Sequence, residues 1–197
     1  MVAAPYAEGV TLRIGFVLGS TPDKWSRAWR HQQAERLELV PIEEADQDAA
    51  LREYDACIVR LPVETTDRHV VRLYNELPVA VMGVEHLLTL AEQLSTADLE
   101  EEQLVLPHPS GWTPAVEQLS WPAMSVKDAI ETVAAGTGVV IVPMSLARLF
   151  HRKDATYRIV TDLEPSTVAL VWDAANDGDR IQTLVGVVKG RTARSSR

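Results

Sequence analysis

Residues 123–148 read AMSVKDAIETVAAGTGVVIVPMSLAR, and this stretch decides the fold. Ser125 and Asp128 form the S-x-x-D pattern that begins a helix, and the apolar spacing behind them predicts a helix over residues 126–135. Gly136 then supplies the residue type that most often ends a helix. The stretch therefore opens with a helix that has both a start and a stop signal.

The second half of the stretch predicts a strand and another helix. Residues 139–142 (VVIV) are apolar at every position, which is typical of a buried central strand. Pro143 and Ser145 begin the next helix, which is expected to end near His151. A helix, a buried strand and a further helix in this order favour an α/β protein.

A similar strand–turn–helix unit lies near the start of the chain. Residues 11–18 (TLRIGFVL) predict a strand that stops at Gly19. Thr21 is expected to cap the next helix, over residues 24–37, with Pro22 at its first position. Helix starts at the carboxyl ends of strands are favourable sites for anions.

The other segments follow the same alternation. Strands are expected at residues 37–42 (an edge strand, because of Pro41), 54–61, 69–74, 78–84, 103–106, 157–160 and 167–172. Helical patterns cover residues 47–53, 85–94, a short turn at 96–100 that Ser95 caps, and a last helix with apolar residues from Ile181 to Val188. We therefore expect an α/β fold with largely parallel sheets.

Composition limits the class of protein. The chain has 197 residues, 46% hydrophobic and 24% charged, which suits one large domain or two small lobes and excludes a wholly disordered chain. The lone Cys57 has no partner within the chain, so a reduced, cytoplasmic setting is expected. No apolar stretch approaches the roughly 20 residues that span a bilayer, and no signal-peptide pattern is present, so no membrane partner is expected.

Charge argues against a nucleic-acid partner. The formal net charge is −9, and the last nine residues (KGRTARSSR) hold four basic and no acidic side chains. This leaves 15 basic against 28 acidic residues in the rest of the chain, and such a body repels phosphate backbones. We expect no direct nucleic-acid binding by this domain, and a solvated basic tail.

Motifs for catalysis, metals and cofactors are missing from the sequence. The glycine patterns fit neither a dinucleotide fingerprint nor a phosphate loop, the five histidines are scattered, and no nucleophile elbow occurs. Residues 100–102 (EEE) are most simply a solvated face, and Asp173, Asp177 and Asp179 lack the register of a calcium loop. We therefore expect a protein that is not an enzyme and has no metal or cofactor.

The order of these segments resembles the effector-binding domain of LysR-type transcriptional regulators. The resemblance rests on LRIGFVLGS (12–20), YDACIVRLPV (54–63), VVRLYNELPVAVM (70–82), LSTADLEEEQLVLP (94–107), residues 123–148, and YRIVTDLEPSTVALVW (157–172). Each motif is weak alone, but together they cover nearly the whole chain from residue 12 to about 190.

The resemblance implies a type 2 periplasmic-binding-protein-like fold with two α/β lobes and two crossover strands as hinge. By analogy the first lobe is residues 12–80 plus 167–190 and the second is residues 81–166, with crossovers near Ala80 and Val168. Residues 1–11 and 191–197 are expected to be flexible ends.

The resemblance also implies that a small molecule binds between the lobes. The positions it assigns to ligand binding are Ser20, Thr21, Leu61, Pro62, Val63, Ser110, Trp112, Ser125, Pro143 and Met144. For Ser20 and Ser125, a role as a helix cap alone is the competing interpretation. Two or three carboxylates in the loop at residues 43–46 (EEAD) disfavour an anionic effector. Trp25 or Trp29 facing the cleft would favour an aromatic or cationic ligand, whereas core packing is the simpler interpretation.

Three functional hypotheses follow from the sequence. The first is a cytoplasmic, non-enzymatic sensor of a small-molecule effector of unknown identity, standing alone without the family's helix-turn-helix and acting through a homodimer or another protein partner. The second is a protein–protein interaction module on the same fold with a non-functional cleft. An enzyme on this fold is the third, and no pairing of a base with a nucleophile supports it.

Overall fold

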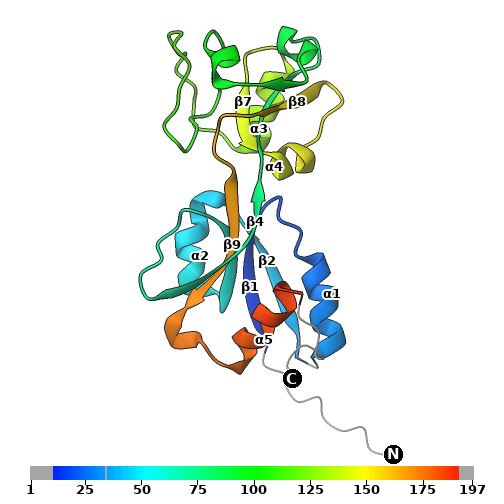
Figure 1. Cartoon of the computed structure of the whole chain (residues 1–197), viewed down its shortest axis with the longest axis vertical. Helices are drawn as coiled ribbons and strands as arrows, with labels where there is room; N and C mark the ends of the chain where they lie inside the picture. Colours follow the sequence, from blue (N-terminus) through cyan, green and yellow to red (C-terminus); the bar gives the residue numbers. More distant parts are fainter. Residues whose placement is uncertain (1–10, 34, 191–197) are drawn as a thin grey trace, which may run out of the picture. The chain divides into compact units, whose positions relative to one another are not determined.

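The computed structural model describes residues 11–33 and 35–190 and divides the chain into two compact units (Figure 1). The first unit runs to Tyr74 and resumes at Thr167, and the second is Asn75–Ser166. Strands β4 (Arg68–Glu76) and β9 (Ser166–Asp173) carry the chain across these two boundaries. The lobe bounds expected from the sequence stay a prediction. The flexible ends expected at residues 1–11 and 191–197 lie, apart from Thr11, outside the described residues.

The first unit contains a five-stranded sheet in the order β2-β1-β3-β9-β4. The further strands are β1 (Leu12–Val17), β2 (Leu37–Ile42) and β3 (Ala56–Arg60). β1 pairs in parallel with β2 and β3, whereas β3 pairs antiparallel with β9. β2 lies at the edge of the sheet, as Pro41 predicts.

Alternating side chains divide the core of this unit between the two faces of the sheet. Residues at every second position of β1, β3 and β9 pack against helices α1 (Asp23–Gln32) and α5 (Asp179–Val188). The residues between them pack against α2 (Gln47–Glu53), which has the expected bounds. Trp25 and Trp29 lie in the first of these clusters, which confirms that both indoles are core residues.

The second unit contains a four-stranded sheet in the order β6-β8-β5-β7. Its strands are β5 (Pro78–Gly83), β6 (Gln93–Leu94), β7 (Val140–Pro143) and β8 (Ala155–Val160). Helix α3 (Val126–Ala134) packs against β5, β7 and β8, and α4 (Met144–Leu149) follows β7 directly. Four 3-10 helices complete the described elements: Glu44–Asp46, Leu87–Leu90, Thr96–Leu99 and Ala174–Asn176.

The expectation of largely parallel sheets is wrong. β9 runs antiparallel to β3, and β5 runs antiparallel to both β7 and β8. The apolar run at residues 139–142 is buried, but β7 lies at the edge of the four strands, where the segment around Leu104 bridges to Val139. An apolar run indicates burial, and it does not say whether a neighbouring strand or a loop provides the cover.

Two expected helices are shorter than their patterns. The helix expected at residues 24–37 ends at Gln32, because the next residues turn toward the pairing of β2 with β1 that begins at Leu37. The helix expected at residues 85–94 is a single 3-10 turn followed by β6. Arg158 accounts for this difference, because its guanidinium binds the carbonyls of Thr89 and Ala91 that a continuing helix would use itself.

Cys57 is buried in the first unit, and burial raises the pKa of its thiol to about 12. The thiol therefore stays protonated near neutral pH and packs as a small apolar side chain. No helix within the described residues has the length and hydropathy that crossing a bilayer requires.

Candidate functional site

The candidate site lies where the parallel strands of the first unit end. β1, β2 and β3 stop at Val17, Ile42 and Arg60, and the loops behind them are residues 18–22, 43–46 and 61–67. Ligands of open α/β sheets bind outside the carboxyl ends of their strands, because helix N-termini and loop backbone meet there. Five of the predicted ligand residues belong to these loops: Ser20, Thr21, Leu61, Pro62 and Val63.

Ser20 is a buried polar residue that does not cap α1. Its side chain is 5% exposed, and its hydroxyl donates to the carbonyl of Val17 at 2.7 Å. The residue that precedes α1 is Pro22, and no side-chain oxygen caps this helix. The expectation that Thr21 caps the helix is therefore wrong: proline, with its fixed φ, takes the cap position and Thr21 is exposed. The capping interpretation of Ser20 fails as well.

Arg60 is the residue of this site that the sequence analysis missed. It is 2% exposed, and its guanidinium donates to the carbonyl of Leu18 at 2.7 Å and to Glu44 at 3.2 Å. Its backbone N–H donates to the side chain of Gln47 at 2.6 Å. One arginine thus ties together the loops that follow β1 and β2. A single basic residue inside the apolar run YDACIVRLPV was the available signal.

The acidic loop at residues 43–46 repels an anionic ligand less than its sequence suggests. Glu44 forms an ion pair with Arg60, so part of the negative charge expected there is neutralised. A cavity of about 480 Å³ lies beside the loop, lined by Ile42, Tyr54 and carboxylates that include Glu43 and Asp46. None of the five predicted residues of this unit lines that cavity.

The segment at residues 61–63 continues the edge beyond β3. Leu61 donates its N–H to the carbonyl of Thr167 at 2.9 Å, next to the point where the chain returns from the second unit to the first. The Leu61–Pro62 peptide bond is cis. Leu61 and Val63 pack against the core on the α2 face, whereas Pro62 is exposed.

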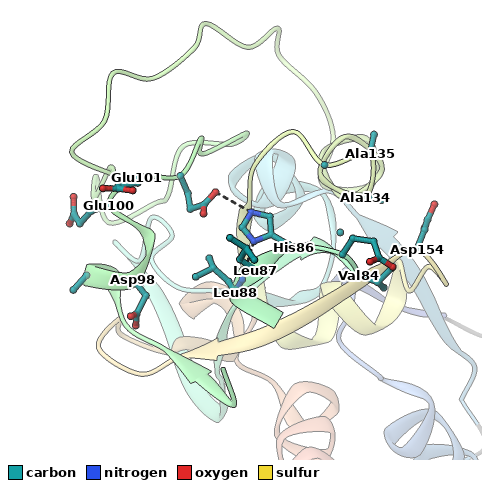
Figure 2. A pocket seen from close by; sticks show the side chains of 15 residues that line it. Val84, His86, Leu87, Leu88, Asp98, Glu100, Glu101, Ala134, Ala135 and Asp154 are labelled. Carbon is teal, nitrogen blue, oxygen red and sulfur yellow. Dashed lines mark hydrogen bonds and ion pairs between the residues drawn. The ribbon is translucent and has the colours of Figure 1, made fainter. Parts of the chain in front are cut away.

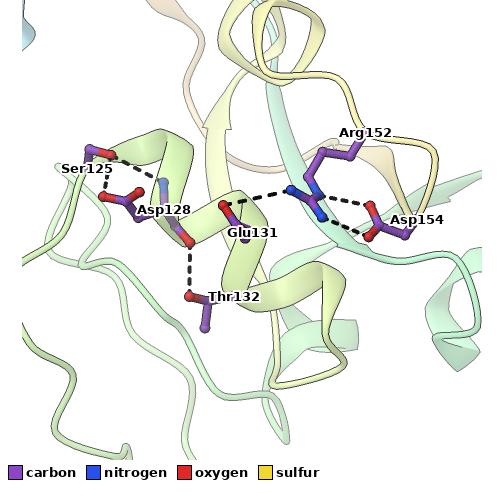
Figure 3. Close-up of polar contacts among 6 residues, drawn as sticks. All are labelled: Ser125, Asp128, Glu131, Thr132, Arg152 and Asp154. Carbon is purple, nitrogen blue, oxygen red and sulfur yellow. Dashed lines mark hydrogen bonds and ion pairs between the residues drawn. The ribbon is translucent and has the colours of Figure 1, made fainter.

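The predicted ligand residues of the second unit lie in three places. Pro143 ends β7, and Met144 donates its N–H to the carbonyl of Leu77 at 2.9 Å. Ser125 caps α3: its hydroxyl accepts from the N–H of Asp128 at 3.2 Å and donates to the Asp128 carboxylate at 2.8 Å (Figure 3). Ser125 therefore caps α3, and its contact with a ligand stays a prediction. The other two positions belong to a loop.

That loop holds Ser110 and Trp112. Ser110 bonds the ring of His108 at 2.7 Å and accepts from the N–H of Trp112 at 3.2 Å. Trp112 packs against the second unit's core and, with His108 and Trp121, lines a cavity of about 620 Å³. Burial lowers the pKa of His108 below its usual range, so its ring favours the neutral form.

A larger cavity in the second unit was not anticipated from the sequence. It measures about 900 Å³ and is lined by residues 83–88, 97–98, 100–102, 134–136 and Asp154 (Figure 2). His86 Nε2 lies 3.2 Å from Glu102 Oε2. The residues that line this cavity come from four separate parts of the sequence, so no local pattern predicts it.

The described residues contain no group of three or more His, Cys, Asp or Glu side chains arranged to hold a metal ion. What the geometry offers is binding: a buried hydroxyl, an uncapped helix start and a fixed loop edge in the first unit, and cavities in both units.

Comparison with known proteins settles the family. A sequence model of the LysR substrate binding domain matches residues 27–193, which is most of the chain. The chain belongs to the LysR substrate binding domain family. No curated protein sequence matches this chain. The resemblance drawn from the sequence is confirmed, and the family consists of effector-binding domains of transcriptional regulators.

Solved structures agree with this family. The effector binding domain of a BenM variant is 23% identical, with a TM-score of 0.74 over 92% of this chain and 97% of that chain. The reduced form of the OxyR regulatory domain from Pseudomonas aeruginosa is 20% identical, with a TM-score of 0.72 over 91% and 96%. The BenM effector binding domain with its effector benzoate is 22% identical, with a TM-score of 0.73 over 91% and 90%. These likenesses confirm the type 2 periplasmic-binding-protein-like fold of this LysR substrate binding domain.

Proposed function

We propose that this LysR substrate binding domain senses a small-molecule effector bound between its two units. Ser20 carries the proposal, because it is a buried hydroxyl at the carboxyl end of β1 that its own helix does not use as a cap. The N–H groups at the start of α1 would add donors for a polar or negatively charged ligand group. Arg60 would keep the loop edge in place and its charge balanced.

Connectivity supports a site that joins the two units. The N–H of Leu61 is hydrogen-bonded to the carbonyl of Thr167, the first residue after one boundary between the units. The N–H of Met144 is hydrogen-bonded to the carbonyl of Leu77, close to the other boundary. Each unit therefore carries part of the predicted ligand set next to a chain crossing. In the proposal, Ser20, Thr21 and residues 61–63 form one wall, and Ser110, Trp112, Ser125, Pro143 and Met144 form the other.

The proposed mechanism involves no chemical step. A ligand that contacts both units stabilises their closed arrangement over the open one, and it shifts the population by its difference in affinity for the two. The output would pass through a homodimer or another protein in the cytoplasm, and the domain itself would not contact nucleic acid.

The test is a binding titration with three probes of one shape and different charge: benzoate, benzamide and benzylamine. Benzoate is the first choice because it is the effector of the BenM domain. At 100 times its dissociation constant a ligand stabilises the fold by about 2.7 kcal/mol, which thermal unfolding detects. If none of the three binds, the same assay is extended to other small carboxylates, aromatic acids, amines and nucleotides.

Ser20→Ala decides whether binding uses the predicted site. This variant removes one hydroxyl and its bond to Val17, and we expect at least tenfold weaker binding. Ser26→Ala, the same change within α1, is the matched control and should bind as the natural protein does. Equal binding by both variants, or no binding by any compound, would contradict the proposal.

A further inference from the structure

The 3-10 turn Leu87–Leu90 in the second unit holds two leucines in water. Leu87 is 81% exposed and Leu90 is 86% exposed, the highest fractions among the described large hydrophobic side chains that are exposed. They are three residues apart, and side chains at i and i+3 of a 3-10 helix lie on the same side. Val84, at 42% exposure, precedes this turn and lines the same cavity as Leu87. We call Leu87 and Leu90 the leucine face.

The leucine face is fixed in position. The carbonyl of His86 accepts from the Thr89 hydroxyl at 2.6 Å, and the His86 ring accepts from the N–H of Leu88 while facing Glu102. On the other side Arg158 donates to the carbonyls of Thr89 and Ala91 at 2.5 and 2.6 Å. These bonds prevent the turn from rotating its leucines inward. Two strongly exposed leucines on one side of a turn differ from the single, scattered apolar residues that the surface of a soluble protein normally shows.

Acidic residues predominate beside Leu87, whereas Leu90 lines a second cavity, of about 490 Å³, with Glu92 and Arg158. The 900 Å³ cavity is lined by Leu87 and Leu88, and six of its described lining residues are carboxylates while none is Lys or Arg (Figure 2). Asp154 is neutralised by Arg152, which binds it through two bonds of 2.8 Å (Figure 3). Glu85 and Glu101 have no hydrogen-bond or ion-pair partner among the described residues. The rim therefore carries uncompensated negative charge.

The 900 Å³ cavity beside Leu87 lies away from the chain crossing that leads to the proposed effector site. Pro78 begins β5 next to the chain crossing, and Gly83 ends it beside the cavity. A six-residue strand is about 17 Å long, so the cavity and the crossing lie at opposite ends of β5. Leu90, by contrast, lines the cavity of about 490 Å³ together with Met144 of the predicted ligand set, so the peptide experiment below is carried out without effector.

We propose that the leucine face and its acidic rim dock a basic amphipathic helix of another protein. The apolar side chains of such a helix would cover Leu87 and Leu90, and its Lys or Arg residues would meet Glu85 and Glu101. Charge complementarity selects this occupant. A second copy of the chain is disfavoured, because its surface outside the basic tail carries the same excess of negative charge. A small ligand within the 900 Å³ cavity would leave Leu90 exposed, and one within the 490 Å³ cavity would leave Leu87 exposed, since neither cavity is lined by both leucines.

The experiment uses the full chain and a fluorescein-labelled 18-residue peptide of leucine and lysine, with the leucines spaced i, i+3, i+4, i+7. Fluorescence anisotropy should show saturable binding that weakens as salt rises. A peptide of the same composition with scrambled order, and one with glutamate in place of lysine, should each bind at least tenfold more weakly. Equal binding of the scrambled or the glutamate peptide would overturn the proposal, and so would no binding of the lysine peptide.

Surface variants locate the binding site. Leu87→Ser combined with Leu90→Ser should weaken peptide binding at least tenfold, and Glu85→Gln combined with Glu101→Gln should reduce both the affinity and its salt dependence. Leu149→Ser is the matched control, because Leu149 is 50% exposed on α4 and lies outside the face. The proposal fails if the control weakens binding as much as the double leucine variant. It also fails if the double leucine variant changes the oligomeric state in sedimentation, because the face would then join copies of this chain.

Discussion

Two glycines that follow α3 give a matched pair of substitutions with different expected costs. Gly136 has a φ of +89°, and a Cβ added there would meet nothing within 4 Å. Gly138 has a φ of +115°, and a Cβ there would lie 2.3 Å from the carbonyl oxygen of Gln103 and 2.9 Å from its Cβ. Both positions strain an alanine, but only Gly138 forces the neighbouring backbone to move.

The structure gives the size of this difference. Gly136→Ala loses only the stability that an alanine in the left-handed conformation costs, about 1–2 kcal/mol. A less flexible unfolded chain partly offsets this loss. Gly138→Ala adds a displacement of the Gln103 carbonyl, which accepts from the N–H of Val139 at 2.9 Å. Val105 in turn donates to the carbonyl of Val139 at 3.0 Å, so two hydrogen bonds worth about 1 kcal/mol each are affected. Adding the backbone strain of an alanine at the positive φ of residue 138, we expect Gly138→Ala to lower the free energy of unfolding by about 4 kcal/mol in total.

Thermal unfolding of both variants tests the expectation. For a chain of this size 1 kcal/mol corresponds to about 2–4 °C, so Gly138→Ala should lower the midpoint several times more than Gly136→Ala. Hydrogen exchange adds a local measurement, since the amides of Val105 and Val139 should lose protection in Gly138→Ala alone. Equal costs in the two variants, or unchanged exchange at these amides, would show that the segment around Gln103 gives way freely and that the reasoning is wrong.

Two further predictions concern the loop at residues 106–125. Because burial lowers the pKa of His108, the unfolded chain binds its proton at a higher pH than the folded chain does, so stability should fall as pH drops through about 6.5. Urea midpoints at pH 7.5 and 5.5 should therefore differ less in His108→Asn than in the natural protein, and an unchanged difference would contradict this assignment. The buried indole N–H of Trp121 has no acceptor among the described residues, so Trp121→Phe should leave the free energy of unfolding unchanged or raise it by up to about 1 kcal/mol. Trp29→Phe, which loses a bond to the Glu35 carbonyl and core volume, should cost more in the same urea titration, and the reverse order would count against the prediction.

Several elements were predictable because their signals are local. Ser125 and Asp128 lie within one turn of the helix that they start, and Gly136 lies directly behind its end. The same holds for α2 and for the turn that Ser95 opens, where the Asp98 carboxylate completes a capping box. Hydrogen bonds between residues three or four apart can be inferred from the order of residue types alone.

The segment at residues 85–94 shows where local reasoning fails. A helix is expected over this segment, yet it forms a single 3-10 turn with Leu87 and Leu90 exposed, and Gln93 pairs with Ile159 in a neighbouring strand. Arg158, more than 60 residues away, binds the carbonyls of this segment. A bond from so far along the chain leaves no trace in the local pattern.

The candidate site likewise has a part that the sequence predicts and a part that it does not. The placement of Ser20 and residues 61–63 at strand ends follows from the strand pattern and from the resemblance to the family. That Ser20 bonds a carbonyl instead of capping α1, and that Arg60 neutralises Glu44, depends on which strands become neighbours.

The sequence by itself determined the α/β class, most of the element order and the family, because periodicity and caps are properties of neighbouring residues. Only the tertiary structure decided the mixed direction of the sheets, the buried arginine of the site and the exposed leucine face with its acidic rim. Each of these depends on contacts between distant residues, and the free energy of such contacts exists only once the chain has folded.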